Sequence, residues 1–187
     1  MLGTARRRAV WAGLVVALGV AASACARLLP GQDVRYSPTP HHVVAAMLRL
    51  AEVGTNDVIY DLGSGDGRIV IAAARDFGAR AVGIEIVPEL LTMGERAAVR
   101  AGVASRVRFV RQDIFQTDLR QATVVTLYLS EAVNARLRPK LLRELRPGSR
   151  IVSYRVDMED WRPDREIVVD VNGEARSVYL WIVPGGR

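Results

Sequence analysis

The sequence predicts an α/β protein with a doubly wound, mostly parallel sheet that ends in an antiparallel hairpin. Strand-like and helix-like stretches alternate from about residue 36 to residue 156, as they do in consecutive βαβ units. The stretch "ATVVTLYL" is an unbroken apolar run, typical of a parallel strand covered on both faces. Near the C-terminus, two strand-like runs flank Asn172-Gly173, a dipeptide typical of hairpin turns. A chain of 187 residues, half of them hydrophobic, has room for one such domain.

The expected elements follow one another along the chain. The first helix covers 39–53, with Thr39 as its N-cap and Pro40 at its first helical position. The next elements are a strand over 57–62, a helix from about 66 to 78, a strand over 80–86, a helix over 88–102, and strands over 106–114 and 122–129. Helical residues continue from Glu131, and we expect Pro139 to begin a new helix, because proline disrupts a helix interior. Strands over 149–156, 166–171 and 174–183 complete a sheet of seven strands.

The N-terminal segment is distinct from this domain. Arg6, Arg7 and Arg8 precede an uncharged, largely apolar run over 9–26, which is the layout of a secretory signal or a short membrane anchor. The letters "AASAC" resemble a lipoprotein cleavage box that ends at Cys25. We therefore expect residues 1–27 to be a signal or anchor and residues 28–187 to be the domain. The protein is expected to be membrane-associated through this segment, with the side of the membrane left open.

Charge and composition exclude several other classes of protein. Four arginines in the first 27 residues account for most of the formal charge of +6, so residues 28–187 carry only +2. Their arginines are scattered among acids, and we expect no nucleic-acid partner. Cys25 is the single cysteine, which leaves no disulfide framework or thiolate site in the domain. His41 and His42 are helix neighbours that point in different directions, so no metal site is expected.

A glycine-rich turn, "DLGSGDG", lies between the first expected strand of the sheet and the next helix. Its spacing does not fit a dinucleotide fingerprint, because Arg68 stands where the third glycine belongs, and no G-K-[ST] follows to cradle phosphate. Glycines there allow a ligand to approach the backbone closely. Asp61 and Asp66 oppose an anion and favour a ligand with an ammonium or sulfonium charge.

The spacing D-x-G-x-G-x-G resembles that of the seven-strand methyltransferases that use S-adenosylmethionine. Glu85 ends the second strand of the sheet about twenty residues later, where such folds place the acid that holds the ribose hydroxyls. Asp113 ends the third strand, where that family places an acid near the adenine. The resemblance implies S-adenosylmethionine as co-substrate and no metal. The implied cofactor-binding residues are Asp61, Gly63, Ser64, Gly65, Gly67, Glu85, Asp113 and Ile114.

A closer resemblance covers nearly the whole domain. The stretches "YSPTPHHVVAAMLRLAEV", "VRFVRQDIF", "LRPKLLRELRPGSRIVS" and "VYLWIVP" look like a family of small methyltransferases that includes archaeal and mitochondrial protein-lysine methyltransferases. This resemblance implies methyl transfer to an accessible lysine of a protein substrate. The implied acceptor-side residues are Tyr128 and Glu131 as catalytic candidates, and Tyr36, Pro38, Ser130 and Tyr154 as substrate-binding candidates. Many relatives have histidine where this chain has Tyr154.

Two other functions fit the same fold. One is a small-molecule methyltransferase, and the other is a non-catalytic envelope protein that keeps only the fold. Little chain remains for a lid once the strands are assigned, which favours an open site and a large acceptor. Trp161 and Trp181 are expected to pack the C-terminal strands and not to form a substrate cage.

Overall fold

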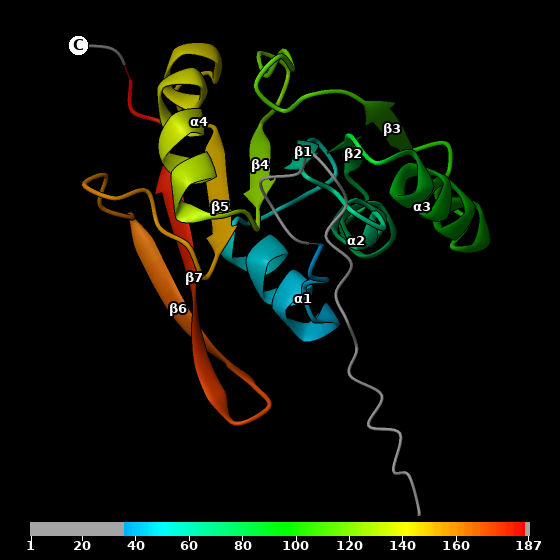
Figure 1. Cartoon of the computed structure of the whole chain (residues 1–187), viewed down its shortest axis with the longest axis horizontal. Coiled ribbons are helices and arrows are strands. Elements are labelled where there is room, and N and C mark those ends of the chain that lie inside the picture. Colours follow the sequence, from blue (N-terminus) through cyan, green and yellow to red (C-terminus); the bar gives the residue numbers. More distant parts are fainter. Residues whose placement is uncertain (1–35, 186–187) are drawn as a thin grey trace, which may run out of the picture.

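The computed structural model describes residues 36–185, which form a seven-stranded sheet with helices on both faces (Figure 1). The strand order is β3-β2-β1-β4-β5-β7-β6. The first five strands pair in parallel, whereas β7 is antiparallel to both β5 and β6. The strands are β1 (Val58–Leu62), β2 (Arg80–Glu85), β3 (Val107–Arg111), β4 (Val124–Leu127), β5 (Arg150–Tyr154), β6 (Arg165–Val171) and β7 (Glu174–Ile182). The predicted fold class is confirmed.

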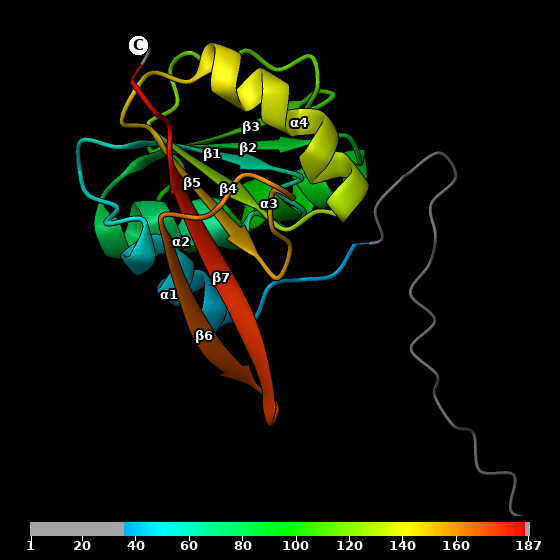
Figure 2. The ribbon, with the colours of Figure 1, turned by 90° about the vertical axis from the view of Figure 1, so that its left-hand side faces the viewer.

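Helices cover the sheet unequally, with α1 (His41–Leu50), α2 (Arg68–Phe77) and α3 (Pro88–Arg100) on one face and α4 (Glu131–Glu144) on the other (Figure 2). Each face has its own apolar core. Val44, Val70 and Ile59 belong to the first, while Leu137 and Trp181 belong to the second. The continuous apolar run of β4 is explained by this arrangement, because all four of its residues are buried between the two layers.

The C-terminal hairpin is formed as the sequence predicts. Asn172 and Gly173 have φ angles of 56° and 82°, the left-handed values that a two-residue turn of type I′ requires. Trp181 is fully buried, and its indole N–H donates to the carbonyl of Trp161 at 2.7 Å. The packing role expected for these two tryptophans is confirmed.

Two helix boundaries differ from prediction. Thr39 does not cap α1, because Pro40 occupies the N-cap position with an extended backbone and no side chain bonds the first turn. Pro139 does not begin a helix but lies inside α4. The helix continues through it because Leu137 and Leu141, on either side of the proline, are completely buried against the sheet, which compensates for the hydrogen bond that proline cannot donate.

The expected signal or anchor at residues 1–27 lies outside the described residues. Within residues 36–185, no helix is long and apolar enough to span a bilayer.

Candidate active site

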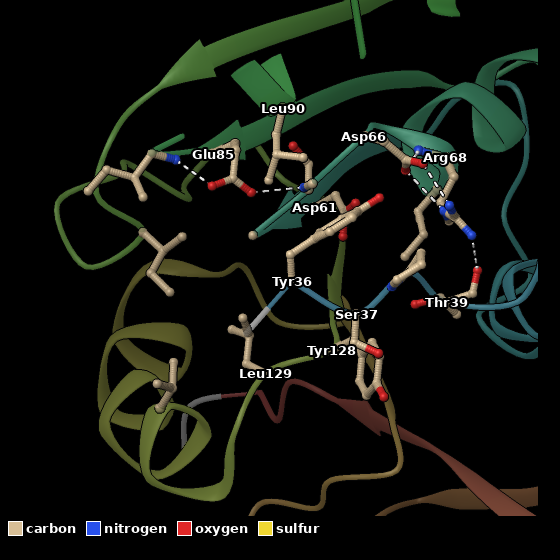
Figure 3. A pocket seen from close by; sticks show the side chains of 18 of the residues that line it. Tyr36, Ser37, Thr39, Asp61, Asp66, Arg68, Glu85, Leu90, Tyr128 and Leu129 are labelled. Carbon is tan, nitrogen blue, oxygen red and sulfur yellow. Dashed lines mark hydrogen bonds and ion pairs between the residues drawn. The ribbon is translucent and has the colours of Figure 1, made fainter. Parts of the chain in front are cut away.

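A cavity of about 280 Å³ lies at the carboxyl ends of β1, β2 and β4 (Figure 3). The chain leaves β1 toward β2 on one side, while β4 lies on the other side of β1. The strand order therefore reverses here, and open α/β sheets bind ligands at such a point. We call this cavity the first cavity.

The glycine turn forms one wall of the first cavity. Gly63, Gly65 and Gly67 all have left-handed φ angles, between 54° and 80°. A Cβ built on Gly65 would lie 2.6 Å from the ring of Tyr36, so a side chain there would both strain the backbone and fill the cavity. Gly67 serves another purpose. A Cβ built on it would lie 2.5 Å from the ring of Phe109 on β3, so only glycine allows that ring to pack there. The turn thus leaves Gly63 exposed, while the missing side chains of Gly65 and Gly67 permit close packing of Tyr36 and Phe109.

Glu85 at the end of β2 is held rigidly in the cavity wall. Its Oε2 accepts from the N–H of Gly65 at 2.9 Å, and its Oε1 accepts from the N–H groups of Ile86 and Val87 at 2.8 and 3.1 Å. A carboxylate has about four acceptor sites, so three backbone donors leave room for a further donor from a ligand. These bonds join the glycine turn to the loop after β2.

Asp61, the penultimate residue of β1, lies on the floor of the first cavity and is almost completely buried. Its Oδ1 accepts from the hydroxyl of Thr126 on β4 at 2.6 Å. Burial raises the pKa of Asp61 to about 7, and the charges of Glu85 and Asp66 act in the same direction, against the hydrogen bond from Thr126. A cationic ligand group would offset this electrostatic cost.

The charge of Asp66 is already paired. Both of its oxygens accept from the guanidinium of Arg68, at 3.0 and 2.6 Å, and another nitrogen of Arg68 donates to the carbonyl of Thr39 at 2.8 Å. Burial acts to raise the pKa of Asp66, but the bonds and charge of Arg68 outweigh it and hold that pKa below its ordinary value. Asp66 is therefore not available to attract a cationic ligand, as the sequence led us to expect. Asp61 and Glu85 are the acids that remain for that role.

This ion pair also ties the segment before α1 across the cavity mouth. Figure 3 shows Tyr36, Ser37 and Thr39 crossing in front of the glycine turn, with the ring of Tyr36 directed toward Asp61 and Asp66. The ring packs over Gly65. Burial, followed by the charge of Asp66, raises the pKa of Tyr36, so its hydroxyl is neutral at physiological pH.

The opposite end of the first cavity is apolar with one acid. Asp113 follows β3, and its Oδ1 accepts from the N–H of Phe115 at 2.9 Å, which fixes the turn after the strand. Ile86, Ile114 and Phe115 line this end. Ile86 is 54% exposed, so its side chain can pack against an apolar group of a ligand.

On the acceptor side, Tyr128 follows β4 and lines the first cavity. It also lines a second cavity, of about 280 Å³, whose wall it shares with Ser37 and Pro38. The ring of Tyr128 packs on that of Tyr154, with centroids 4.7 Å apart. Tyr154 lines only the second cavity, so these two tyrosines form the boundary between the cavities.

The structure brings together most of the residues that the sequence predicted for the site. Four predicted residues of the described chain do not line the first cavity: Gly67, Ser130, Glu131 and Tyr154. Ser130 is the N-cap of α4, and Glu131 is exposed on its first turn. Within residues 36–185, no group of three or more His, Cys, Asp or Glu side chains could hold a metal ion. That methyl transfer needs no metal stays a prediction.

Several lining residues were missed by sequence reasoning. Arg136 of α4 lies over the ring of Phe115 at 3.7 Å from its centroid, and both line the first cavity. Leu90, Leu129 and Val133 add apolar wall. Positions next to the predicted acids, such as Ile86 after Glu85, could have been inferred from the sequence, but the reach of Arg136 across the cavity depends on tertiary packing.

The strand order, the glycine turn and the acids at the carboxyl ends of β1, β2 and β3 define a class I methyltransferase. The sequence profile of the ANTKMT methyltransferase domain family matches residues 61–165. The chain belongs to this family.

Individual relatives extend over most of the domain. A protein-lysine N-methyltransferase of Saccharolobus islandicus is 42% identical over 151 residues, which cover 80% of this chain and 94% of that protein. The adenine nucleotide translocase lysine N-methyltransferase of Mus musculus is 37% identical, and the match covers 66% of this chain and 58% of that protein. A crystal structure of an RNA methyltransferase from Salinibacter ruber with S-adenosyl-L-homocysteine is 52% identical, with a TM-score of 0.76 and coverage of 81% and 96%.

Proposed function

We propose that this protein transfers the methyl group of S-adenosylmethionine to a lysine side chain of another protein. The observation that carries the proposal is the 42% identity to the Saccharolobus islandicus protein-lysine N-methyltransferase over 94% of that protein. The mouse relative, also named as a lysine methyltransferase, supports the same acceptor chemistry. The matched S-adenosyl-L-homocysteine complex supports the choice of donor.

The first cavity fits such a donor in shape and charge. Asp61 would hold the ammonium group, because it is a buried carboxylate that gains from a cationic partner. Glu85 would hold the ribose hydroxyls with its remaining acceptor capacity. Ile86 and Ile114 would cover the faces of the adenine.

S-adenosylmethionine supplies an activated methyl group on a sulfonium. The protein therefore has to position the acceptor amine in line and keep water out, and orientation supplies most of the rate enhancement. The lone pair of the lysine Nζ forms the new N–C bond as the C–S bond breaks with both electrons to sulfur, and the methylated amine then loses a proton to solvent.

Tyr128 is the group best placed to orient the amine. It lines both cavities, and its exposed hydroxyl accepts a hydrogen bond from Arg155 at 3.4 Å. A tyrosine hydroxyl both donates and accepts, so it can accept from the amine while its ring restricts the approach. Tyr154, packed on Tyr128, fixes the position of that ring.

An RNA acceptor is the second candidate, because the 52% identical Salinibacter ruber protein is named an RNA methyltransferase. The charge of this chain disfavours it. Residues 36–185 carry twenty Lys and Arg against nineteen Asp and Glu, whereas RNA-binding surfaces are strongly basic. The lysine proposal is therefore retained as the first.

The proposal is tested by incubating the full-length protein with methyl-tritiated S-adenosylmethionine and a cell extract freed of small molecules. The label should be acid-precipitable, and protease but not ribonuclease should release it. Release by ribonuclease alone would overturn the lysine proposal in favour of RNA. A Gly65→Ala variant serves as the control without donor binding.

Membrane association through residues 1–27 is a separate proposal that rests on the sequence alone. Cells that express wild type or Cys25→Ser can be fractionated, with protease added to intact spheroplasts. Membrane recovery that depends on Cys25 would support a lipid anchor, and recovery of both proteins wholly in the soluble fraction would refute the proposal.

A further inference from the structure

The second cavity has the position expected of a site for the acceptor protein. It shares Ser37, Pro38 and Tyr128 with the first cavity, and its other lining residues come from the end of β5, the tip of the β6–β7 hairpin and Pro40. In-line transfer requires the acceptor to approach from the side opposite the donor sulfur. A chain segment in the second cavity could place a side chain beside Tyr128 without displacing a donor in the first.

Two arginines line this cavity, and the backbone holds both in place. Arg155 has a φ angle of 68°, which is costly for a residue other than glycine. Its backbone N–H donates to the carbonyl of Ser177 on β7 at 2.8 Å, and its guanidinium donates to Tyr128. Arg176 lies within β7 and pairs with Glu174.

The hairpin tip is tied to α1 by the bond between His42 and the carbonyl of Asp170, at 2.8 Å.

The charges in the cavity indicate which residues surround the acceptor. Arg155 and Arg176 repel a lysine ammonium, so neither serves as its binding partner. Guanidinium groups near an amine favour its neutral form, which is the form that attacks. The lining residues include two arginines against one glutamate, which is paired with Arg176, so a net positive charge remains. That charge matches the carboxylates of neighbouring residues on an acceptor segment, and arginine binds carboxylates with two parallel hydrogen bonds.

We propose that the second cavity binds the segment that carries the acceptor lysine and selects acidic residues next to that lysine. This inference rests on the proposed lysine activity and names its substrate class.

Three peptides test the inference, identical except that the central lysine is flanked by aspartates, asparagines or arginines. The full-length protein should methylate the aspartate peptide with a kcat/KM about three- to tenfold above that of the asparagine peptide, which is the range for two partly exposed ion pairs. The arginine peptide should be the poorest substrate. The difference should lie mainly in KM, because the flanking residues do not touch the reacting atoms.

Charge reversal provides the matched variants. Arg155→Asp replaces the positive charge with a negative one and uses a residue type that tolerates the left-handed backbone at this position. Arg176→Glu reverses the charge of the second arginine. Each variant should reduce or invert the order of the three peptides. Arg162→Glu, an exposed arginine that does not line the cavity, is the control and should leave the order unchanged. Unaltered binding of S-adenosyl-L-homocysteine by calorimetry shows that each variant is folded.

The outcomes separate this inference from the proposed function. Lysine methylation with equal kcat/KM for all three peptides, or an order that Arg155→Asp and Arg176→Glu leave intact, would overturn the inference alone. Methylation of RNA with no methylation of any peptide would overturn both.

Discussion

Binding of the donor should weaken as the pH falls through 7, because of Asp61. Burial raises the pKa of this carboxyl to about 7 in the ligand-free protein. The ammonium of the donor requires the ionised carboxylate, so binding shifts the pKa of Asp61 downward and releases a proton. A proton that binds only to the free protein competes with the ligand, and affinity therefore rises with pH up to about 7 and then levels off.

The size of the effect follows from the fraction of Asp61 that is ionised. With a pKa of about 7, roughly three quarters of the side chain is ionised at pH 7.5 and about one tenth at pH 6.0. The dissociation constant of S-adenosyl-L-homocysteine should thus be about eightfold larger at pH 6.0 than at pH 7.5. Calorimetry in two buffers of different ionisation enthalpy measures both the constant and the released proton.

Two controls isolate the carboxylate. 5′-Methylthioadenosine lacks the amino-acid portion of the donor, so its affinity should be nearly the same at both pH values. Asp61→Asn should bind S-adenosyl-L-homocysteine weakly and without this pH dependence. An equal affinity of wild type at pH 6.0 and 7.5, or the same pH dependence in Asp61→Asn, would refute the assignment of Asp61 to the ammonium.

Three further predictions concern single residues. Without ligand, the burial of Asp61 costs stability as the pH rises from its unfolded pKa near 4 through about 7, so Asp61→Asn should raise the melting temperature at pH 8 and change it little at or below pH 4, with about 4 kcal/mol as the upper limit of the gain; a lower melting temperature at pH 8 would contradict this. Gly65→Ala should abolish calorimetric binding of S-adenosyl-L-homocysteine, since its Cβ would lie 2.6 Å from the ring of Tyr36. Gly54→Ala, whose Cβ would meet nothing within 4 Å, should bind normally. Retained binding in Gly65→Ala would show that the turn does not contact the donor. Tyr128→Phe should lower kcat about tenfold, which is the effect of losing one hydrogen bond to the amine. Glu131→Gln, on the exposed face of α4, should keep wild-type kcat in the same labelling assay. A loss of kcat in Glu131→Gln but not in Tyr128→Phe would assign catalysis to Glu131.

The donor side of the site could be predicted from the sequence because it is local. Asp61, Gly63 and Gly65 lie at one junction between a strand and a helix, Glu85 is the last residue of β2, and Asp113 lies two residues after β3. The apolar pattern already predicts these strands. Parallel strands bring their carboxyl ends to one edge of the sheet. Spacing along the chain therefore determines which of these residues meet.

Other features depend on contacts between distant segments. Arg68, which pairs with Asp66, also donates to the carbonyl of Thr39, and this bond joins the glycine turn to the segment before α1. The continuation of α4 through Pro139 depends on burial against the sheet. The left-handed backbone of Arg155 is held by a bond to β7. No periodicity or motif signals such contacts, because propensity is a weak prior that tertiary packing overrides.

The central claim, methyl transfer to a protein lysine, is tested most directly by identifying the methylated product. The full-length protein is incubated with deuterated-methyl S-adenosylmethionine and a protein extract, the products are hydrolysed to amino acids and nucleosides, and both are analysed by mass spectrometry. We predict deuterated Nε-methyl-lysine that is absent with Gly65→Ala. Deuterium in a nucleoside, in a carboxyl ester or in small molecules, with none in lysine, would contradict the account.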